Sequence, residues 1–120
     1  MTNTAAQDAL TVSALTSSLK ALLEDSFSAV CVTGEISNFK HHSSGHMYFS
    51  LKDEKSQLRC VMWRWQNQLL RFTPEDGMQV ILRGDISVYE SRGEYQLVTQ
   101  SMQPAGEGAL LAAFEQLKTR

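Results

Sequence analysis

The 120-residue sequence has only two cysteines, two prolines and no long apolar run. No stretch approaches the roughly 18 apolar residues that a membrane-spanning helix needs. The first nine residues lack the basic start and the apolar centre of a secretory signal. With 20% charged and 8% aromatic residues, the composition excludes a disordered chain, a collagen and a disulfide-rich scaffold. We therefore expect one soluble, cytoplasmic domain that makes no contact with a membrane.

Both cysteines lie in short apolar runs, Cys31 between two valines and Cys60 within 58–62. Cysteine is among the most buried residue types, and a reducing compartment keeps thiols free. We expect both side chains to be small buried hydrophobes. A disulfide between them would require an oxidising compartment.

The common catalytic and cofactor motifs are missing: the sequence contains no GxxxxGK[ST], GxGxxG, HExxH, CxxC or GxSxG. His41, His42 and His46 raise the question of zinc. Adjacent loop histidines rarely converge on one ion, however, and no cysteine pair or nearby carboxylate completes a tetrahedral set. Most acidic residues fall in turns and on separate strands, where solvated carboxylates are the default. We expect no catalytic residue, no metal site and no cofactor in this chain.

Charge is unevenly placed along the chain. Six of the 11 basic residues, but only two of the 13 acidic ones, fall between Asn38 and Thr73, and all three histidines lie there too. A slightly acidic protein can therefore present a basic face to phosphates, because local potential steers an anion more than net charge does. Chance segregation on a short chain would give the same pattern.

Hydrophobic periodicity predicts a helix followed by strands. Apolar residues recur at helical spacing over about 12–25, with Thr11 or Ser13 available as an N-cap. The Ser/Thr-rich polar face weakens this helix, so it needs a partner surface. The period then shortens to two in five segments: 30–37, 46–52, 58–63, 80–89 and 95–102. A short helix or irregular crossover is expected at 66–71. A final helix is predicted from an apolar stripe at Leu110, Leu111, Phe114 and Leu117.

Alternation assigns one face of each strand to a core, except at 95–102, where adjacent Leu97 and Val98 leave the inward face ambiguous. The inward residues are Val30, Val32, Gly34, Ile36, Met47, Phe49, Leu51, Leu58, Cys60, Met62, Val80, Leu82, Gly84, Ile86 and Val88. Interior glycines such as Gly34 and Gly84 permit the coiling and bulges that barrel closure requires.

The order of helix, three strands, crossover and two strands is that of the OB-fold. A β-sandwich would normally need about seven strands. We therefore predict an all-β fold, a five-stranded OB barrel with an N-terminal and a C-terminal helix. The predicted division is a disordered tail at 1–10, the barrel with its leading helix at 11–104, and the start of a helical connection at 105–120.

The outward residues of these strands, together with one loop lysine, combine aromatic rings with cations. Single-stranded nucleic acid binds where bases stack on rings while cations follow the phosphates. Tyr48 is expected to face outward. Trp63 points either outward or, after a one-residue bulge, into the barrel, and Trp65 is expected to pack against the crossover. The candidate contacts are Lys40, His46, Tyr48, Lys52, Arg59, Trp63, Arg83 and Tyr89.

Several of these residues lie in runs that resemble a known family. The runs are 34–39, 44–53 and 59–63, and the later stretches 76–80, 88–97 and 102–110 agree with them. Over about residues 11–120 the chain resembles the N-terminal domain of the bacterial exodeoxyribonuclease VII large subunit. Trp63 stands where that family usually has phenylalanine, a change that keeps an aromatic ring.

The resemblance implies an OB-fold that grips single-stranded DNA for a nuclease that trims it from both ends to oligonucleotides. The family's catalytic region lies downstream, so this chain is expected to bind DNA and to cut nothing. The implied partners are single-stranded DNA and, through the downstream part, the exodeoxyribonuclease VII small subunit. The terminal helix stripe is expected either to pack on its own barrel or to join two chains in a homodimer.

Two other functions remain open. One is RNA binding, as in the anticodon-binding OB-folds of aminoacyl-tRNA synthetases, because OB surfaces accept either sugar. The other is a subunit-assembly module whose strand face contacts protein and no nucleic acid. Competition between DNA and RNA oligomers distinguishes the first alternative from DNA binding. A salt titration separates the second, because phosphate binding weakens steeply as salt rises.

Overall fold

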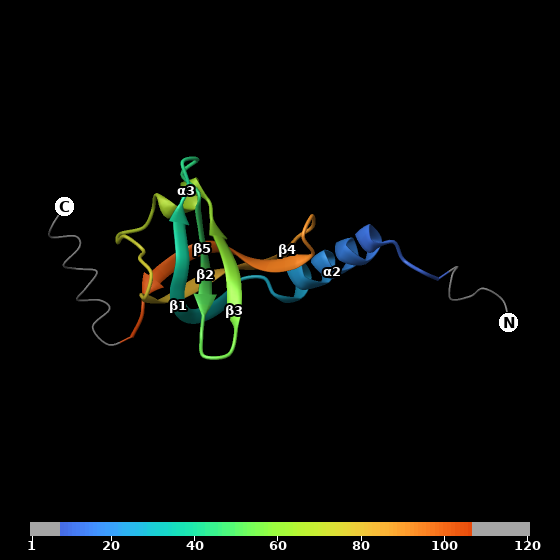
Figure 1. The fold of residues 1–120 in the computed structure, drawn as a ribbon, viewed down its shortest axis with the longest axis horizontal. Helices are drawn as coiled ribbons and strands as arrows, with labels where there is room; N and C mark the ends of the chain where they lie inside the picture. The colour runs from blue at the N-terminus through green and yellow to red at the C-terminus, as the bar shows by residue number, and fades with distance from the viewer. Residues whose placement is uncertain (1–7, 107–120) are drawn as a thin grey trace.

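The computed structural model describes residues 8–106 and contains a closed five-stranded barrel with the strand order β1-β2-β3-β5-β4 (Figure 1). The elements are α2 (Val12–Ser26), β1 (Val30–His41), β2 (Met47–Lys52), β3 (Gln57–Met62), α3 (Arg64–Asn67), β4 (Gln79–Tyr89) and β5 (Glu94–Pro104). This order confirms the predicted OB-fold. The predicted terminal helix and most of the predicted tail lie outside the described residues. No helix among residues 8–106 is both long and apolar enough to cross a membrane.

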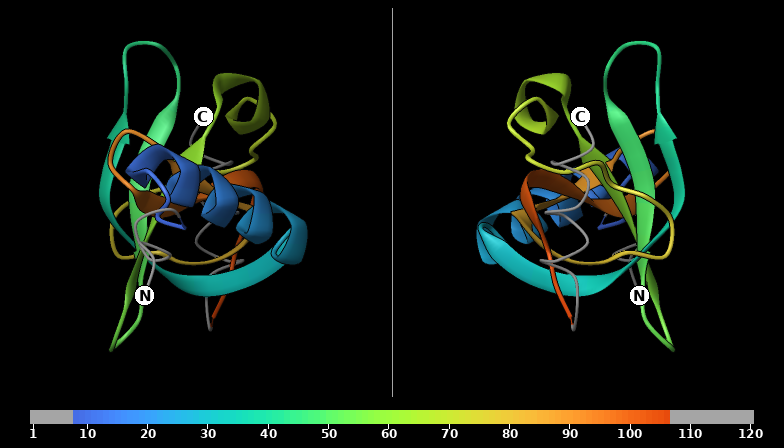
Figure 2. Two further views of the ribbon diagram at one scale, coloured as in Figure 1. Left: turned by 90° about the vertical axis from the view of Figure 1, so that its right-hand side faces the viewer. Right: turned by 90° about the vertical axis from the view of Figure 1, so that its left-hand side faces the viewer.

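β1 is long enough to close the barrel by itself, because it pairs with two different strands. Residues 30–35 pair with β4 and residues 35–41 pair with β2, and Figure 2 shows β1 curving around the barrel end. Gly34 lies at the crossing, where a Cβ would be 2.8 Å from Leu51 Cγ. All neighbouring strands run antiparallel except β3 and β5, which are parallel.

The predicted alternation is confirmed on β2 and β4, whose inward side chains form much of the core. The buried hydrophobic cluster is Ile36, Met47, Phe49, Leu51, Cys60, Met62, Phe72, Val80, Leu82, Leu97 and Met102. The ambiguity on β5 has a geometric cause, since Arg83 pairs with Ser101 but Gly84 pairs with Thr99. One extra residue of β5 therefore changes the face that points inward, and both Leu97 and Met102 reach the core.

The two cysteines differ. Cys60 is buried, as predicted, and this burial raises the pKa of its thiol to about 12. For Cys31 the prediction was wrong, because its side chain is exposed. Val30 and Val32 take the inward face of β1, so the period-two pleat turns the residue between them outward. An apolar run is therefore a weaker indicator of burial than the strand's alternation.

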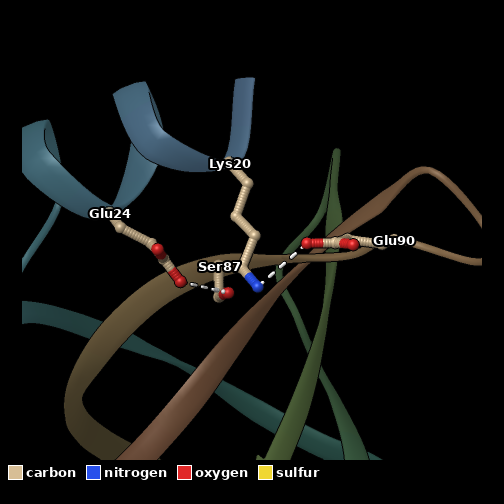
Figure 3. Close-up of polar contacts among 4 residues, drawn as sticks. All are labelled: Lys20, Glu24, Ser87 and Glu90. Carbon is tan, nitrogen blue, oxygen red and sulfur yellow. Dashed lines mark hydrogen bonds and ion pairs between the residues drawn. The ribbon is translucent and has the colours of Figure 1, made fainter. Parts of the chain in front are cut away.

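α2 confirms the predicted helix and its N-cap, where the hydroxyl of Thr11 accepts a hydrogen bond from the N–H of Ala14 at 3.0 Å. The helix lies against the β4–β5 hairpin through polar contacts. Lys20 Nζ is 3.0 Å from Glu90 Oε1, and Ser87 Oγ donates to Glu24 Oε2 at 2.8 Å (Figure 3). The hydrogen bond to Glu90 and its charge raise the pKa of Lys20.

The apolar stripe of α2 finds only part of the partner surface that we expected. None of its residues is buried, and Leu15, Leu19 and Leu22 are exposed. Leu23 near the end of the helix and Phe27 after it instead contribute to the lining of a mostly apolar cavity of about 390 Å³, whose other lining residues come from the strands and the β2–β3 turn.

Candidate nucleic-acid interface

The outer face of β2 and β3 carries a hollow that extends to the β4–β5 turn. It holds about 190 Å³ and is lined by Tyr48, Arg59, Tyr89, Arg92, Glu94, Tyr95 and Gln96. The three tyrosines are 38%, 50% and 56% exposed, in chain order. Their rings are therefore accessible to a planar ligand, with guanidinium groups beside them.

A second hollow, of about 220 Å³, shares Tyr48 and Arg59 with the first and reaches Lys40. A β-bulge brings Lys40 there: Ser37 pairs with Ser50 and Lys40 pairs with Tyr48, so two residues of β1 face one residue of β2. We call the three tyrosines and three basic residues that line the two hollows the tyrosine groove: Lys40, Tyr48, Arg59, Tyr89, Arg92 and Tyr95.

The bulge follows from its local sequence. Asn38 has a φ of 51°, a left-handed conformation that asparagine adopts more readily than most residues. The N–H of Phe39 then donates to Asp76 Oδ1 at 2.9 Å, which ties the bulge to the turn before β4. The position of Lys40 in the second hollow therefore depends on the bulge in β1 and not on strand alternation alone.

The cations of the tyrosine groove are not neutralised by their neighbours. Within residues 8–106, Lys40, Arg59 and Arg92 form no ion pair, because the two ion pairs found there join other residues. Glu94 contributes a carboxylate to the lining, while Glu90 in the same turn is held by Lys20. The groove therefore combines three cations with one carboxylate, a balance that attracts anions.

The groove contains four of the eight candidate residues, namely Lys40, Tyr48, Arg59 and Tyr89. Sequence reasoning missed Arg92 and Tyr95. Arg92 lies in a turn whose nearness to β2 is a tertiary property. Tyr95 belongs to the strand whose inward face was ambiguous. The sequence signal that could have identified them is Arg92 in a predicted turn between two tyrosines, Tyr89 and Tyr95.

Two candidates lie elsewhere. Lys52 Nζ is 3.6 Å from Glu35 Oε2, and the residue lines the apolar cavity below α2. Arg83 lies in the middle of β4, paired with Cys31 of β1 and Ser101 of β5. This part of the barrel is separated from β2 and β3 by a strand on either side. The structure therefore does not bring Lys52 or Arg83 to the groove.

The remaining candidates, His46 and Trp63, form what we call the tryptophan cluster together with Trp65. The ring centroid of His46 is 5.0 Å from that of Trp63 and 5.8 Å from that of Trp65, both edge-on, and the two indoles are 6.0 Å apart at 24°. Trp63 is partly buried but lies outside the core cluster, which favours the outward alternative. Trp65 does not pack against the crossover as expected: it lies on these two rings and is 60% exposed.

Each of the three histidines has a ring nitrogen in a polar contact, two within their own loop and one with α3. His41 Nε2 lies 3.1 Å from Gly45 O, and His42 Nδ1 accepts from the N–H of Ser44 at 3.0 Å. His46 Nδ1 accepts from the N–H of Arg64 at 3.0 Å. In the described part of the chain, no three His, Cys, Asp or Glu side chains converge on a point where they could hold a metal ion.

Known proteins similar to this chain agree with its fold. The large subunits of exodeoxyribonuclease 7 from Enterobacter sp. (strain 638), Syntrophotalea carbinolica and Halalkalibacterium halodurans are 51%, 54% and 53% identical over 92%, 92% and 95% of this chain. The chain spans about a quarter of their length, 24%, 28% and 25% respectively. The resemblance that the sequence motifs indicated is thereby confirmed.

Solved structures are similar at the level of fold. A replication protein A heterotrimer bound to ssDNA matches with a TM-score of 0.54 at 12% identity, over 77% of this chain and 70% of that chain. The Stn1-ten1 complex of S. pombe matches with a TM-score of 0.52 at 17% identity, over 78% and 68%. The family described as OB-fold nucleic acid binding domain matches residues 10–103. With its closed barrel and its groove of rings and cations, the chain belongs to this family of OB-fold nucleic acid binding domains.

Proposed function

We propose that the tyrosine groove binds single-stranded DNA and positions it for hydrolysis to oligonucleotides by a part of the protein outside this chain. The observation that carries this proposal is the gathering of Tyr48, Tyr89 and Tyr95 with three unpaired cations along one face. The names of the relatives support a nuclease that acts on DNA. The replication protein A structure, described as bound to ssDNA, supports the same ligand.

Binding follows from the chemistry of the groove. Bases stack on exposed rings, and each stacked base contributes about 1 to 3 kcal/mol. Arg59 between the two hollows contacts phosphates, with Lys40 on one side and Arg92 on the other. Duplex DNA hides its base faces within the stack, so rings that lie in a groove favour an unpaired strand.

The rest of the function depends on parts that lie outside this chain. Relatives are about four times as long as the chain, which leaves room for a catalytic region. We infer that this domain itself cuts nothing, that a small subunit joins through the remaining part, and that the complex works in the cytoplasm. A homodimer through the stripe at 110–117 also remains a proposal.

The direct test is binding of a fluorescent oligothymidylate to the 120-residue chain, followed by anisotropy. A Tyr48→Ala/Arg59→Ala double variant is expected to lose most of the binding. The matched control is Lys52→Ala/Arg83→Ala, which also removes cations but leaves the groove intact, and it should bind like wild type. Equal binding by both double variants would reject the groove as the site.

RNA binding is separated in the same assay by competition with an RNA oligomer of the corresponding sequence. If the chain prefers RNA, the ligand is RNA in place of DNA, and the groove is still the binding site. The assembly alternative has an observation of its own, since Leu15, Leu19 and Leu22 of α2 are exposed. An assembly module would bind no oligonucleotide at any salt concentration.

A further inference from the structure

The tryptophan cluster lies beyond the tyrosine groove, where the loop before β2 meets α3. Trp65 is 60% exposed, although burial of so large an apolar ring is strongly favourable. A large aromatic side chain left in water is a feature of contact surfaces. The cluster therefore has the character of a binding surface, and it lies outside the tyrosine groove.

Hydrogen bonds join the two segments that carry the rings, the loop before β2 and α3, before any ligand arrives. The N–H of Arg64 donates to His46 Nδ1, and Asn67 Nδ2 donates to Gly45 O at 2.8 Å and to Met62 O at 3.3 Å. The side chain of Arg64 covers Gly45, where a Cβ would lie 2.6 Å from Arg64 Cδ. A fixed platform loses little conformational entropy on binding, which favours affinity.

The cluster continues the row of rings that the groove begins. Met47 pairs with Met62 and Tyr48 with Val61, so His46 and Trp63 lie next to each other, one residue beyond the paired ends of β2 and β3. The ring of His42 stands edge-on to Tyr48, with their centroids 6.2 Å apart. A ligand that leaves the groove past Tyr48 in this direction therefore meets imidazole and indole rings next.

We propose that Trp65, supported from behind by Trp63, is a further stacking site for a base of the same single-stranded nucleic acid. This inference rests on the proposed function and extends it, because the strand then runs from the β4–β5 turn across Tyr48 to α3. Trp63 lies nearly parallel to Trp65, at 24°, and so supports one face of its ring. Because Trp65 is 60% exposed, the opposite face is the one that takes the base.

The test uses the fact that Trp63 and Trp65 are the only tryptophans in the sequence, so fluorescence excited beyond the absorption band of tyrosine reports on this cluster alone. The 120-residue chain is titrated with oligothymidylates of 3 and 12 nucleotides. The longer strand should quench the fluorescence. Trp65→Ala should weaken binding of the longer strand about tenfold and leave the shorter one unaffected, while Trp65→Phe should keep most of the affinity.

The matched control is Leu69→Ala, since Leu69 follows the same short helix, is 74% exposed and carries no ring. It should bind both strands like wild type. If Trp65→Ala binds the longer strand like wild type while Tyr48→Ala does not, the stacking site is wrong and the proposed function stands. If wild type binds neither strand, both are wrong. If Trp65→Ala proves misfolded, the titration of wild type decides. Binding of the longer strand without quenching of the tryptophan fluorescence would overturn the stacking site.

Discussion

Tyr48 is the residue on which the groove depends most, because its ring lines both hollows. We expect Tyr48→Ala to weaken binding of single-stranded DNA by about 1 to 3 kcal/mol, the contribution of one stacked base. Tyr48→Phe keeps the ring and should bind nearly as well as wild type. Anisotropy titrations of the two variants make this comparison.

Tyr48 is 38% exposed, so the alanine variant should unfold at nearly the same temperature as wild type. Leu22→Ala, on the exposed stripe of α2, is a control for removal of an apolar side chain that does not line the groove. If Tyr48→Ala bound DNA as tightly as this control, stacking at the groove would be rejected.

The two cysteines make an independent residue-scale prediction. Cys31 is exposed, whereas the thiol of Cys60 is buried with a pKa of about 12 and stays protonated and inaccessible. At pH 8 the native chain should therefore take up one equivalent of a maleimide reagent, counted by mass spectrometry. The native Cys31→Ser variant should take up none, and the unfolded wild-type chain should take up two. Rapid labelling of native Cys31→Ser would contradict the buried position of Cys60.

Cys60 also predicts a pH dependence. An unfolded cysteine ionises near its ordinary value of 9.0, but the native thiol does so only at about 12. Between these values the native state binds more protons than the unfolded state, so the free energy of unfolding falls as pH rises. Denaturant titrations at pH 8 and 10.5 should show this fall, and Cys60→Ala should reduce it. An equal fall in both proteins would assign the effect to other groups.

At the scale of elements, the pairing of β4 with β5 depends on Gly84. A Cβ there would collide with the carbonyl oxygen of Val98, and backbone moves less readily than a side chain. We expect Gly84→Ala to destabilise the barrel by about 1 to 3 kcal/mol, the usual cost of overpacking. Gln103→Ala, on an exposed position of β5, is the control. Urea unfolding of the two variants provides the measurement. Equal midpoints would show that β4 and β5 accommodate the added methyl group without loss of stability.

The elements themselves were largely predictable from local patterns. Alternation in β2 and β4 identified their inward faces, and the spacing of leucines identified α2, with Thr11 as one of two candidate caps. The inward face of β5 was not predictable, because the extra residue opposite Gly84 has no distinct sequence pattern. The packing of α2 was not predictable either, since polar pairs with Ser87 and Glu90 join it to the hairpin, whereas most of its leucines are exposed.

The candidate site was predictable in part for the same reason. Alternation placed Tyr48 and Arg59 outward on neighbouring strands, and the structure brings them together. Arg83 has the same alternation, but closure of the barrel carries it to another side. Which outward residues share one face depends on curvature and closure, and a single strand's pattern contains no information on either.

For the whole molecule, the distribution of charge matters more than its sum. The chain has a formal net charge of −2, yet Lys40, Arg59 and Arg92 line one groove, while the carboxylates of Glu35 and Glu90 are paired with lysines. Such a protein attracts a polyanion to one face and repels it from others. The barrel, by closing, is what separates these faces.

The most direct measurement is the salt dependence of single-stranded DNA binding for wild type, Arg59→Ala and Arg83→Ala. Each phosphate contact that is lost should reduce the slope of log affinity against log salt concentration by about 0.7. The tyrosine groove predicts this reduction for Arg59→Ala and the wild-type slope for Arg83→Ala. Equal slopes for wild type and Arg59→Ala, or a reduction confined to Arg83→Ala, would contradict DNA binding in the groove.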